Sequence, residues 1–251
     1  MSYHGLPCWY ELATNDLDRA KAFYGTIFGW SVADSNTPGM TYMLATAGAA
    51  MVAGMMKAEG PQPLAWSIYF AVTDCDASVS EATSLGATVL VPPTDIPNTG
   101  RFAILADPQS ATFSLLQPMS IEGSDTSRAF DQKLPGHGNW NELITPDPVK
   151  ALAFYGKLLG WTQTRAMPMG PEMTYYIFAH EGVEIGGTCA MPGAAPHWKP
   201  YFGVSSAGAS IKAVTAAGGK VLHGPDEVPG GAFTVQISDP QGVTLALVGP
   251  A

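Results

Sequence analysis

The sequence predicts an α+β protein built from four strand–helix–strand–strand–strand modules. This expectation depends on a long internal repeat and on the order of elements within each copy of it. Residues 9–30 read WYELATNDLDRAKAFYGTIFGW, and residues 140–161 read WNELITPDPVKALAFYGKLLGW. A carboxylate recurs in the middle of what is otherwise a strand-like stretch, as Glu11 and Glu142.

The repeat continues to the end of each copy, because MTY and DPQ motifs also occur twice at matching places. We therefore expect two tandem domains, at residues 5–118 and 137–249. Residues 119–136 between them are polar and lack periodicity, which predicts a linker with few contacts.

The first half of each copy opens with a strand, at Pro7–Thr14 in copy one. Asp16 is then placed to cap a helix that ends at Gly29, and apolar residues recur at helical spacing between them. Copy two repeats this with Asp147 and Pro148 at the helix start. The stretches MTYMLATAG and AAMVAGMM predict the next strands.

The second half of each copy repeats the same order. WSIYFAVT predicts a strand, and a helix carrying Val79 and Ala82 follows and stops at Gly86. FAILADPQSATFSLLQ then predicts two strands around an Asp-Pro turn. Four modules of this kind account for both copies.

The composition narrows the possible partners. Twelve Lys and Arg against 21 Asp and Glu give a net charge of −9, so nucleic acid is not an expected partner. No apolar run approaches the roughly 20 residues that cross a bilayer, so no membrane partner is expected either. The three cysteines form no metal or disulfide pattern, and the start shows no secretory signal, so we expect a cytoplasmic protein, as monomer or homodimer.

The modules resemble those of the vicinal oxygen chelate superfamily, which includes glyoxalase I, extradiol dioxygenases and the bleomycin and fosfomycin resistance proteins. The resemblance is carried by AKAFYGTIFGW and ALAFYGKLLGW, by SLGATV and AAGGKV, and by the ADPQ and SDPQG turns. It covers nearly all of both copies. It implies two tandem glyoxalase/bleomycin-resistance-type domains, each with a curved mixed eight-stranded sheet whose concave side, the cup, holds a ligand and often a divalent metal.

The resemblance also implies where metal ligands would lie in each cup. Metal-bearing members supply His, Gln or Glu side chains from the first and last strands of the paired modules. The matching positions here are Trp9, Gly54, Ser67 and Ser114 in copy one, and Trp140, Gly186, Lys199 and Ala246 in copy two. None is a customary ligand, so we expect neither a metal nor another cofactor. His4 and His137 precede the first strands, a position from which they could reach the rim of a cup, but they are expected, like the other histidines, to be exposed in loops.

Strand alternation predicts which side chains share the cup. Trp9 and Glu11 face the same way, as do their counterparts in copy two, and Glu184 is expected to share a face with Gly186. The candidate ligand-binding residues are therefore Trp9, Glu11, Ser67, Tyr69, Trp140, Glu142, Glu184, Lys199 and Tyr201. A structural alternative is that the strand Glu bonds backbone amides or a Tyr hydroxyl.

Three functional hypotheses follow. The favoured one is a metal-free small-molecule binding protein, whose aromatic and acidic cups suit a flat or cationic organic ligand. The second is a glyoxalase-like lyase, isomerase or hydroxylase-type enzyme that uses Glu11 or Glu142 as general base. The third is an interaction or structural protein whose cups are filled by their own side chains.

Overall fold

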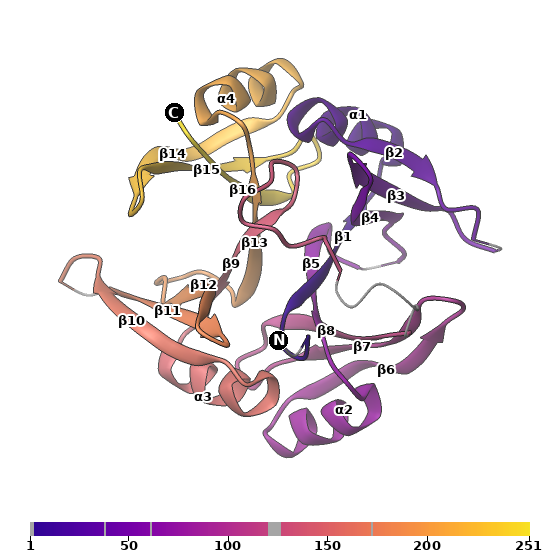
Figure 1. Cartoon of the computed structure of the whole chain (residues 1–251), viewed down its shortest axis with the longest axis vertical. Helices are drawn as coiled ribbons and strands as arrows, with labels where there is room; N and C mark the ends of the chain where they lie inside the picture. The colour runs from indigo at the N-terminus through magenta and orange to yellow at the C-terminus, as the bar shows by residue number, and fades with distance from the viewer. Residues whose placement is uncertain (1–2, 38, 61, 120–126, 172) are drawn as a thin grey trace. The chain divides into compact units, whose positions relative to one another are not determined.

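The computed structural model describes residues 3–251 except 38, 61, 120–126 and 172. Within these described residues, sixteen strands and four helices form four βαβββ modules in chain order, as predicted (Figure 1). No helix in the described part of the chain is long and apolar enough to span a membrane.

Copy one supplies modules 1 and 2. Module 1 consists of β1 (Pro7–Thr14), α1 (Leu17–Phe28), β2 (Ser31–Asp34), β3 (Tyr42–Ala47) and β4 (Ala50–Lys57). Module 2 consists of β5 (Ala65–Ala71), α2 (Cys75–Ser84), β6 (Thr88–Ile96), β7 (Gly100–Ala106) and β8 (Thr112–Pro118).

Copy two supplies modules 3 and 4. Module 3 consists of β9 (Gly138–Ile144), α3 (Pro148–Leu159), β10 (Thr162–Pro168), β11 (Thr174–His180) and β12 (Val183–Cys189). Module 4 consists of β13 (His197–Gly203), α4 (Ala207–Ala216), β14 (Lys220–Val228), β15 (Ala232–Ser238) and β16 (Thr244–Gly249).

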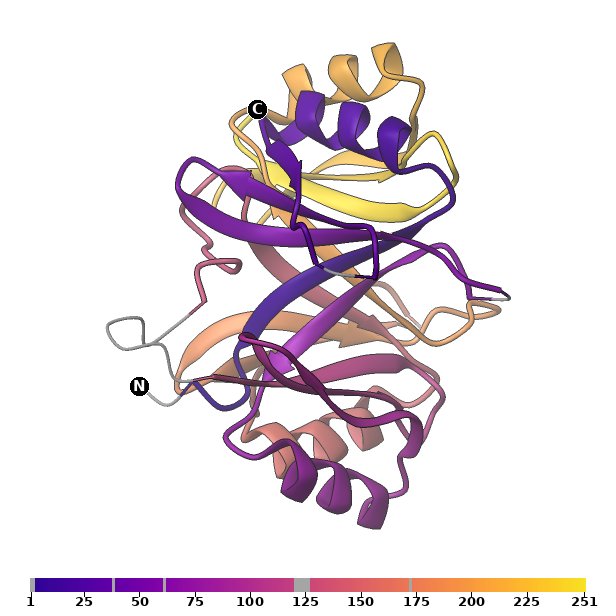
Figure 2. The same ribbon diagram turned by 90° about the vertical axis from the view of Figure 1, so that its right-hand side faces the viewer.

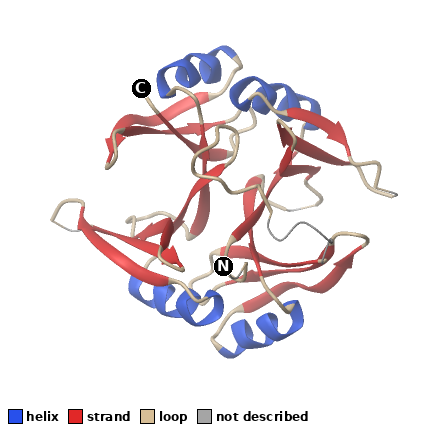
Figure 3. Cartoon of the chain, viewed as in Figure 1, coloured by secondary structure: helices blue, strands red, loops and turns tan. Residues whose placement is uncertain are grey.

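Each copy forms one mixed eight-stranded sheet. The strand orders are β2-β3-β4-β1-β5-β8-β7-β6 and β10-β11-β12-β9-β13-β16-β15-β14. Within every module the first strand pairs in parallel with the last, as β1 does with β4, and the remaining pairs are antiparallel. The helices cover one face of the strands in each module (Figure 3). The predicted fold class is confirmed.

The first helix of each copy forms for the reasons that the sequence suggested. The Asp16 side chain accepts a bond from the Arg19 backbone N–H, and Asp147 does the same for Lys150. Each helix ends at a glycine with left-handed backbone, at φ of 68° for Gly29 and 72° for Gly160. The predicted apolar stripes are buried, namely Ala20, Phe23, Tyr24 and Ile27 in α1, and Ala151, Phe154, Tyr155 and Leu158 in α3.

The chain also divides into two compact units that mix the copies. The first compact unit comprises residues 1–8, 68–127 and 141–198, so it holds most of modules 2 and 3. The second comprises 9–67, 128–140 and 199–251, so it holds most of modules 1 and 4. The helices pair accordingly, with α2 beside α3 in one unit and α1 beside α4 in the other (Figures 1 and 2).

The cores of the two compact units use matching residues. In the second unit Tyr24 donates to Asp239 at 3.0 Å and receives a bond from the Trp66 indole at 3.1 Å. In the first unit Tyr155, Asp107 and Trp198 repeat this at 3.1 and 3.1 Å. Each of these Trp–Tyr–Asp hydrogen-bond chains joins the first helix of one copy, α1 or α3, to the DPQ turn of the other copy.

Two tryptophans that the sequence placed in the core are indeed buried. Trp30 donates to the Gly136 carbonyl in the second unit, and Trp161 donates to the Gly5 carbonyl in the first, both at 2.7 Å. Both therefore fill the interior and satisfy their single polar atom.

The predicted linker makes more contacts than expected. Its residues 120–126 lie outside the described residues. Further along, Gly136 donates to the Gly203 carbonyl at 2.8 Å, and Asp131 and Gly138 exchange backbone bonds with their neighbours. The expectation of few contacts is therefore wrong for 129–136, because this stretch fills a place beside Trp30 and β13.

Candidate functional site

The central feature of copy one is a hydrogen-bond chain that runs from Trp9 through Tyr42 to Glu11. Trp9 and Glu11 lie two residues apart on β1 and so share a face. The Trp9 indole donates to the Tyr42 hydroxyl at 2.9 Å, and Tyr42 donates to the Glu11 carboxylate at 2.8 Å. All three residues belong to the second compact unit.

Gly54 makes room for this chain. It pairs with Glu11 in the parallel ladder between β1 and β4. A Cβ atom on Gly54 would lie only 1.9 Å from the Tyr42 hydroxyl oxygen. The phenol therefore occupies the space that a side chain at position 54 would need, and any larger residue there would displace Tyr42.

The electrostatics keep Tyr42 protonated. Burial, followed by the negative charge of Glu11, raises the pKa of Tyr42 well above its ordinary value. Tyr42 therefore stays protonated near neutral pH and donates a hydrogen bond to the Glu11 carboxylate. Trp9 and Glu11 are only half-buried. The result is a carboxylate held in a fixed direction beside an indole, which suits a cation or a hydrogen-bond donor.

Copy two carries the same elements, of which Glu142, Tyr175 and Gly187 belong to the first compact unit. Glu142 on β9 pairs with Gly187 on β12, and the ring of Tyr175 on β11 covers that glycine. A Cβ on Gly187 would lie 2.3 Å from the Tyr175 ring. Glu142 is buried, with 7% of its surface exposed. Trp140, the counterpart of Trp9, lies half-buried on the same strand.

The predicted position Gly186 is wrong by one residue. Gly186 pairs with Asn141 and lies against Phe178, on the side of the sheet opposite to Glu142. The cause is the spacing of the repeat, since the step from Met40 to Met173 in the MTY motif is the same as the step from Gly54 to Gly187. Next to these glycines β12 carries a bulge, where its register with β11 shifts between Gly186 and Glu184, and β4 carries the equivalent bulge. Gly187 is therefore the residue that corresponds to Gly54.

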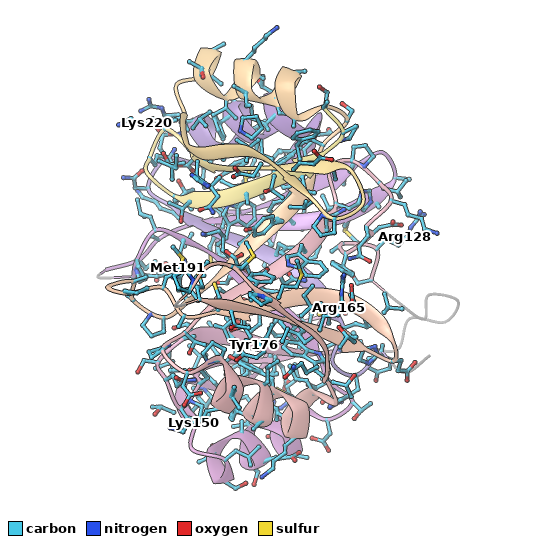
Figure 4. The ribbon with its side chains drawn as sticks, turned by 90° about the vertical axis from the view of Figure 1, so that its left-hand side faces the viewer. Arg128, Lys150, Arg165, Tyr176, Met191 and Lys220 are labelled. Carbon is cyan, nitrogen blue, oxygen red and sulfur yellow. The ribbon has the colours of Figure 1, made fainter. Side chains whose placement is uncertain are left out.

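The same bulge changes the environment of Glu184. It places Glu184 on the face opposite to Gly186, so the predicted shared face is wrong. Glu184 nevertheless lies on the same face of the sheet as Glu142, as predicted, because that face carries Gly187 and not Gly186. Arg165 on β10 binds Glu184 at 2.8 and 2.5 Å and lowers the pKa of that carboxyl (Figure 4).

The candidate residues of the remaining strands lie as follows. Tyr69 on β5 is buried and pairs with Ser114 on β8, whose hydroxyl is buried with no hydrogen-bond partner among the described residues. Ser67 lies on the same strand and is half-buried. In the second compact unit Lys199 on β13 donates to Gln236 on β15 at 3.0 Å. Tyr201, two residues after Lys199, is also buried.

Two of the histidines, His137 and His180, differ from the expectation of exposed loop positions, whereas His223 is exposed. His137 is 4% exposed and its Nδ1 lies 3.1 Å from the Pro135 carbonyl. His180 is 5% exposed and its Nε2 lies 2.7 Å from the carbonyl of His4. In each residue one ring nitrogen is paired with a backbone carbonyl, whereas Nε2 of His137 is buried without a hydrogen-bond partner among the described residues.

The residues present do not fit a divalent metal. In the part of the chain that the structure describes, no three His, Cys, Asp or Glu side chains converge on a point. The strand positions facing Glu11 and Glu142 are glycines covered by phenols. The positions facing Tyr69 and Tyr201 are Ser114 and Ala246. In copy one a single carboxylate beside aromatic rings gives too few ligand bonds for zinc, iron or manganese. In copy two the second carboxylate on this face, Glu184, is already bound by Arg165.

Several residues of the site are not among those predicted from the sequence. Tyr42 and Tyr175 had a signal, since both end the repeated MTY motif. An apolar hollow of about 350 Å³ was also missed, although its two segments are rich in Met and Pro. It lies between the β10–β11 and β12–β13 connections, close to Met191, and its lining comprises Met169, Gly170, Pro171, Met173, Ala190 and Pro192 (Figure 4).

A family model matches both copies. It is described as the Glyoxalase/Bleomycin resistance protein/Dioxygenase superfamily, and it covers residues 8–115 and 139–247.

Two kinds of curated relatives match nearly the whole chain. "Putative glyoxylase CFP32" of Mycobacterium tuberculosis is 35% identical over 257 residues, which cover 98% of this chain and 95% of the relative. "Anthracycline biosynthesis protein DauV" of Streptomyces sp. (strain C5) is 28% identical over 263 residues, with 97% and 93% covered.

Solved structures share the fold at low sequence identity. The 2,3-dioxygenase LapB from Pseudomonas sp. KL28 superposes with a TM-score of 0.70 at 14% identity, covering 100% of this chain and 94% of that one. The Mn(II)-bound glyoxalase from Novosphingobium aromaticivorans gives 0.68 at 17% identity, with 99% and 83% covered.

Proposed function

The chain belongs to the Glyoxalase/Bleomycin resistance protein/Dioxygenase superfamily, and from this premise we propose that it binds a small organic molecule without a metal ion. The ligand is a flat aromatic compound with a cationic or hydrogen-bond-donating group. It lies against Trp9 and directs that group to Glu11.

The observation that carries this proposal is the Trp9–Tyr42–Glu11 chain. One carboxylate oxygen is fixed by the Tyr42 hydroxyl, at 2.8 Å, while the carboxylate as a whole stays half-buried. A preorganised carboxylate beside an indole face recognises a cation both by charge and by cation–π attraction. Such a few polar groups in an aromatic setting are typical of small-molecule sites.

The metal-free part of the proposal is supported by Tyr42 and Gly54. The phenol lies where a ligand side chain from β4 would be needed, and Gly54 itself offers no donor atom. A metal would therefore find one carboxylate, already bonded to a phenol, and no second carboxylate or imidazole from this strand pair.

The relatives support a flat ligand. Two of them are named for the biosynthesis of anthracyclines, which are planar fused-ring compounds. A planar ring system of that kind matches stacking on Trp9 better than a short aliphatic substrate would.

A second candidate function is enzymatic, with Glu11 or Glu142 as general base, and a relative named as a glyoxylase favours it. The same hydrogen bond that fixes Glu11 works against this role. Donation from Tyr42 stabilises the carboxylate form and so makes it a weaker base. We therefore rank binding above proton abstraction.

A third candidate, a purely structural Glu, is compatible with the Tyr42 bond. Replacing Glu11 by Gln separates it from ligand binding, because the amide oxygen still accepts from Tyr42 but the charge is gone. A ligand contact predicts roughly tenfold or greater loss of affinity for 2-naphthylmethylammonium, measured by calorimetry, with little change in melting temperature. A structural role predicts a lower melting temperature with unchanged affinity.

The proposed location is the cytoplasm. Cys8, Cys75 and Cys189 are all free and buried. Free thiols of this kind are ordinary in a reducing compartment.

A further inference from the structure

We propose that the cationic ligand binds in copy one only, and that the residue at position 67 makes this difference between the copies. Copy one has Ser67 there, and copy two has Lys199 at the matching position, since each comes two residues before the tyrosine of a repeated Tyr-Phe pair. This inference rests on the proposed function, because it assigns the ligand to one of two similar cups. Both residues belong to the second compact unit.

Ser67 shares a sheet face with Trp9. Strand β5, which carries Ser67, is the neighbour of β1 in the sheet. Tyr10 on β1 and Trp66 on β5 mark the core face of these strands, because both pack against the ring of Phe202, at 5.1 and 5.2 Å. Successive residues of a strand point to opposite faces, so Trp9 and Ser67 both point away from that core.

This face of copy one suits a ligand cation. The side chain of Ser67 is short and uncharged, and the residue is half-buried, as Trp9 is. Glu11 lies on the same face and supplies the negative charge. A ligand ammonium that approaches the Glu11 carboxylate from the ring of Trp9 therefore meets no repulsion from position 67.

Lys199 places an ammonium group on the matching face of copy two. Its strand, β13, is the neighbour of β9, which carries Trp140. Lys199 lies an odd number of positions before Phe202, whose ring belongs to the core, so its side chain points to the opposite face. The residue is 7% exposed and has its partners within the protein, Gln236 among them at 3.0 Å. The ammonium is therefore a fixed part of this cup.

A resident ammonium in copy two disfavours a second one. Like charges repel strongly where water is excluded, because an enclosed site screens them much less than solvent does. A ligand that stacks on Trp140 would have to bring its cation to the face that already holds Lys199, whereas a ligand on Trp9 meets a serine. Copy two thus carries, as a side chain, the cationic group that copy one takes from its ligand.

The first test is the binding stoichiometry of the wild-type chain. The probe 2-naphthylmethylammonium is titrated calorimetrically into the full chain, and we expect saturation at one equivalent per chain. Two equivalents of similar affinity would overturn the inference, since both cups would then accept the cation. This measurement requires no substitution, so it decides the question even if a variant folds poorly.

The second test places the residue of copy two in copy one. Ser67→Lys adds a positive charge, and Ser67→Met is the matched control, with a side chain of similar length and no charge. A neutral probe with the same ring, 2-naphthylmethanol, reports any steric effect that the two variants share. We expect the ratio of ammonium affinity to alcohol affinity to be roughly tenfold or more lower in Ser67→Lys than in Ser67→Met. An equal ratio in the two variants overturns the inference.

The outcomes separate this inference from the proposed function. If the ammonium probe binds in a Glu11-dependent way, but with two equivalents or regardless of the charge at position 67, only the assignment to copy one fails. If the wild-type chain shows no saturable binding of the ammonium probe, the proposed function fails and this inference fails with it.

Discussion

Glu11 and Tyr42 depend on each other at the level of single atoms. Burial and the neighbouring carboxylate raise the pKa of the phenol, and the phenol fixes the carboxylate. The shared face of Trp9 and Glu11 was predictable from strand alternation alone. The position of Tyr42 was not, because it comes from another strand and depends on a glycine that faces Glu11 across the ladder.

Replacing Tyr42 by Phe should destabilise the protein. The substitution leaves the Trp9 N–H and one Glu11 oxygen without the bond they now make, and because both residues are half-buried this costs about 1 kcal/mol. Urea unfolding monitored by circular dichroism measures this. Tyr176→Phe on β11 is the control, with an expected change within about 0.5 kcal/mol. Equal stability of the two variants would mean that the chain at Glu11 contributes nothing to folding.

The thiols should be unreactive in the native protein. Burial raises the pKa of Cys75 to about 11 and raises that of Cys8 further. The reactive thiolate therefore forms only well above neutral pH. We expect almost no reaction with Ellman's reagent at pH 8, and reaction of three thiols after unfolding in guanidinium. Rapid modification of the folded chain at pH 8 would contradict the buried placement.

At the scale of elements, the two Trp–Tyr–Asp chains attach each first helix to the DPQ turn of the other copy. Burial and the neighbouring Asp raise the pKa values of Tyr24 and Tyr155, so both remain donors. Helix boundaries were predictable because their signals are local, such as the capping Asp and the final glycine. The β12 bulge was not predictable, because Ile185 fits either face of a strand as a buried apolar residue.

Tyr24 and Tyr155 should contribute similar amounts to the free energy of unfolding. Tyr24→Phe removes the donor to Asp239 and the acceptor for Trp66, and Tyr155→Phe does the same to Asp107 and Trp198. Each is expected to lower the free energy of unfolding by about 1–3 kcal/mol. Thermal melts of the single and double variants test this. If only one of the two variants lost stability, only one compact unit would depend on its Trp–Tyr–Asp hydrogen bonds.

At the scale of the whole molecule, the sheets follow the copies but the compact units do not. Each unit combines a module of copy one with a module of copy two. The sequence could not decide this, because both copies carry the same helix and the same DPQ turn. The residues around Tyr24, Asp107 and Asp239 give no sign of which Asp the tyrosine will bind. In the structure Tyr24 binds Asp239 of the other copy.

Separated copies should therefore fold poorly. A fragment of residues 1–118 lacks Asp239 and Gln241, whose side chains bind Tyr24 and the backbone of Asp16 in the full chain. We expect the isolated fragment to lose cooperative unfolding, and to regain it when mixed with residues 119–251. Cooperative melting of the isolated fragment as a monomer would contradict this, and sedimentation velocity establishes its state.

The central claim is that a carboxylate, and no metal, holds the ligand in copy one. The most direct test is calorimetric titration of 2-naphthylmethylammonium into chelator-treated wild type and into Glu11→Gln, each also after addition of Mn²⁺, Zn²⁺ or Fe²⁺. We predict that chelation and metal addition leave the wild-type affinity unchanged, while Glu11→Gln lowers it roughly tenfold or more. Affinity that disappears on chelation and returns with a metal, or that is the same in wild type and Glu11→Gln, would contradict the claim.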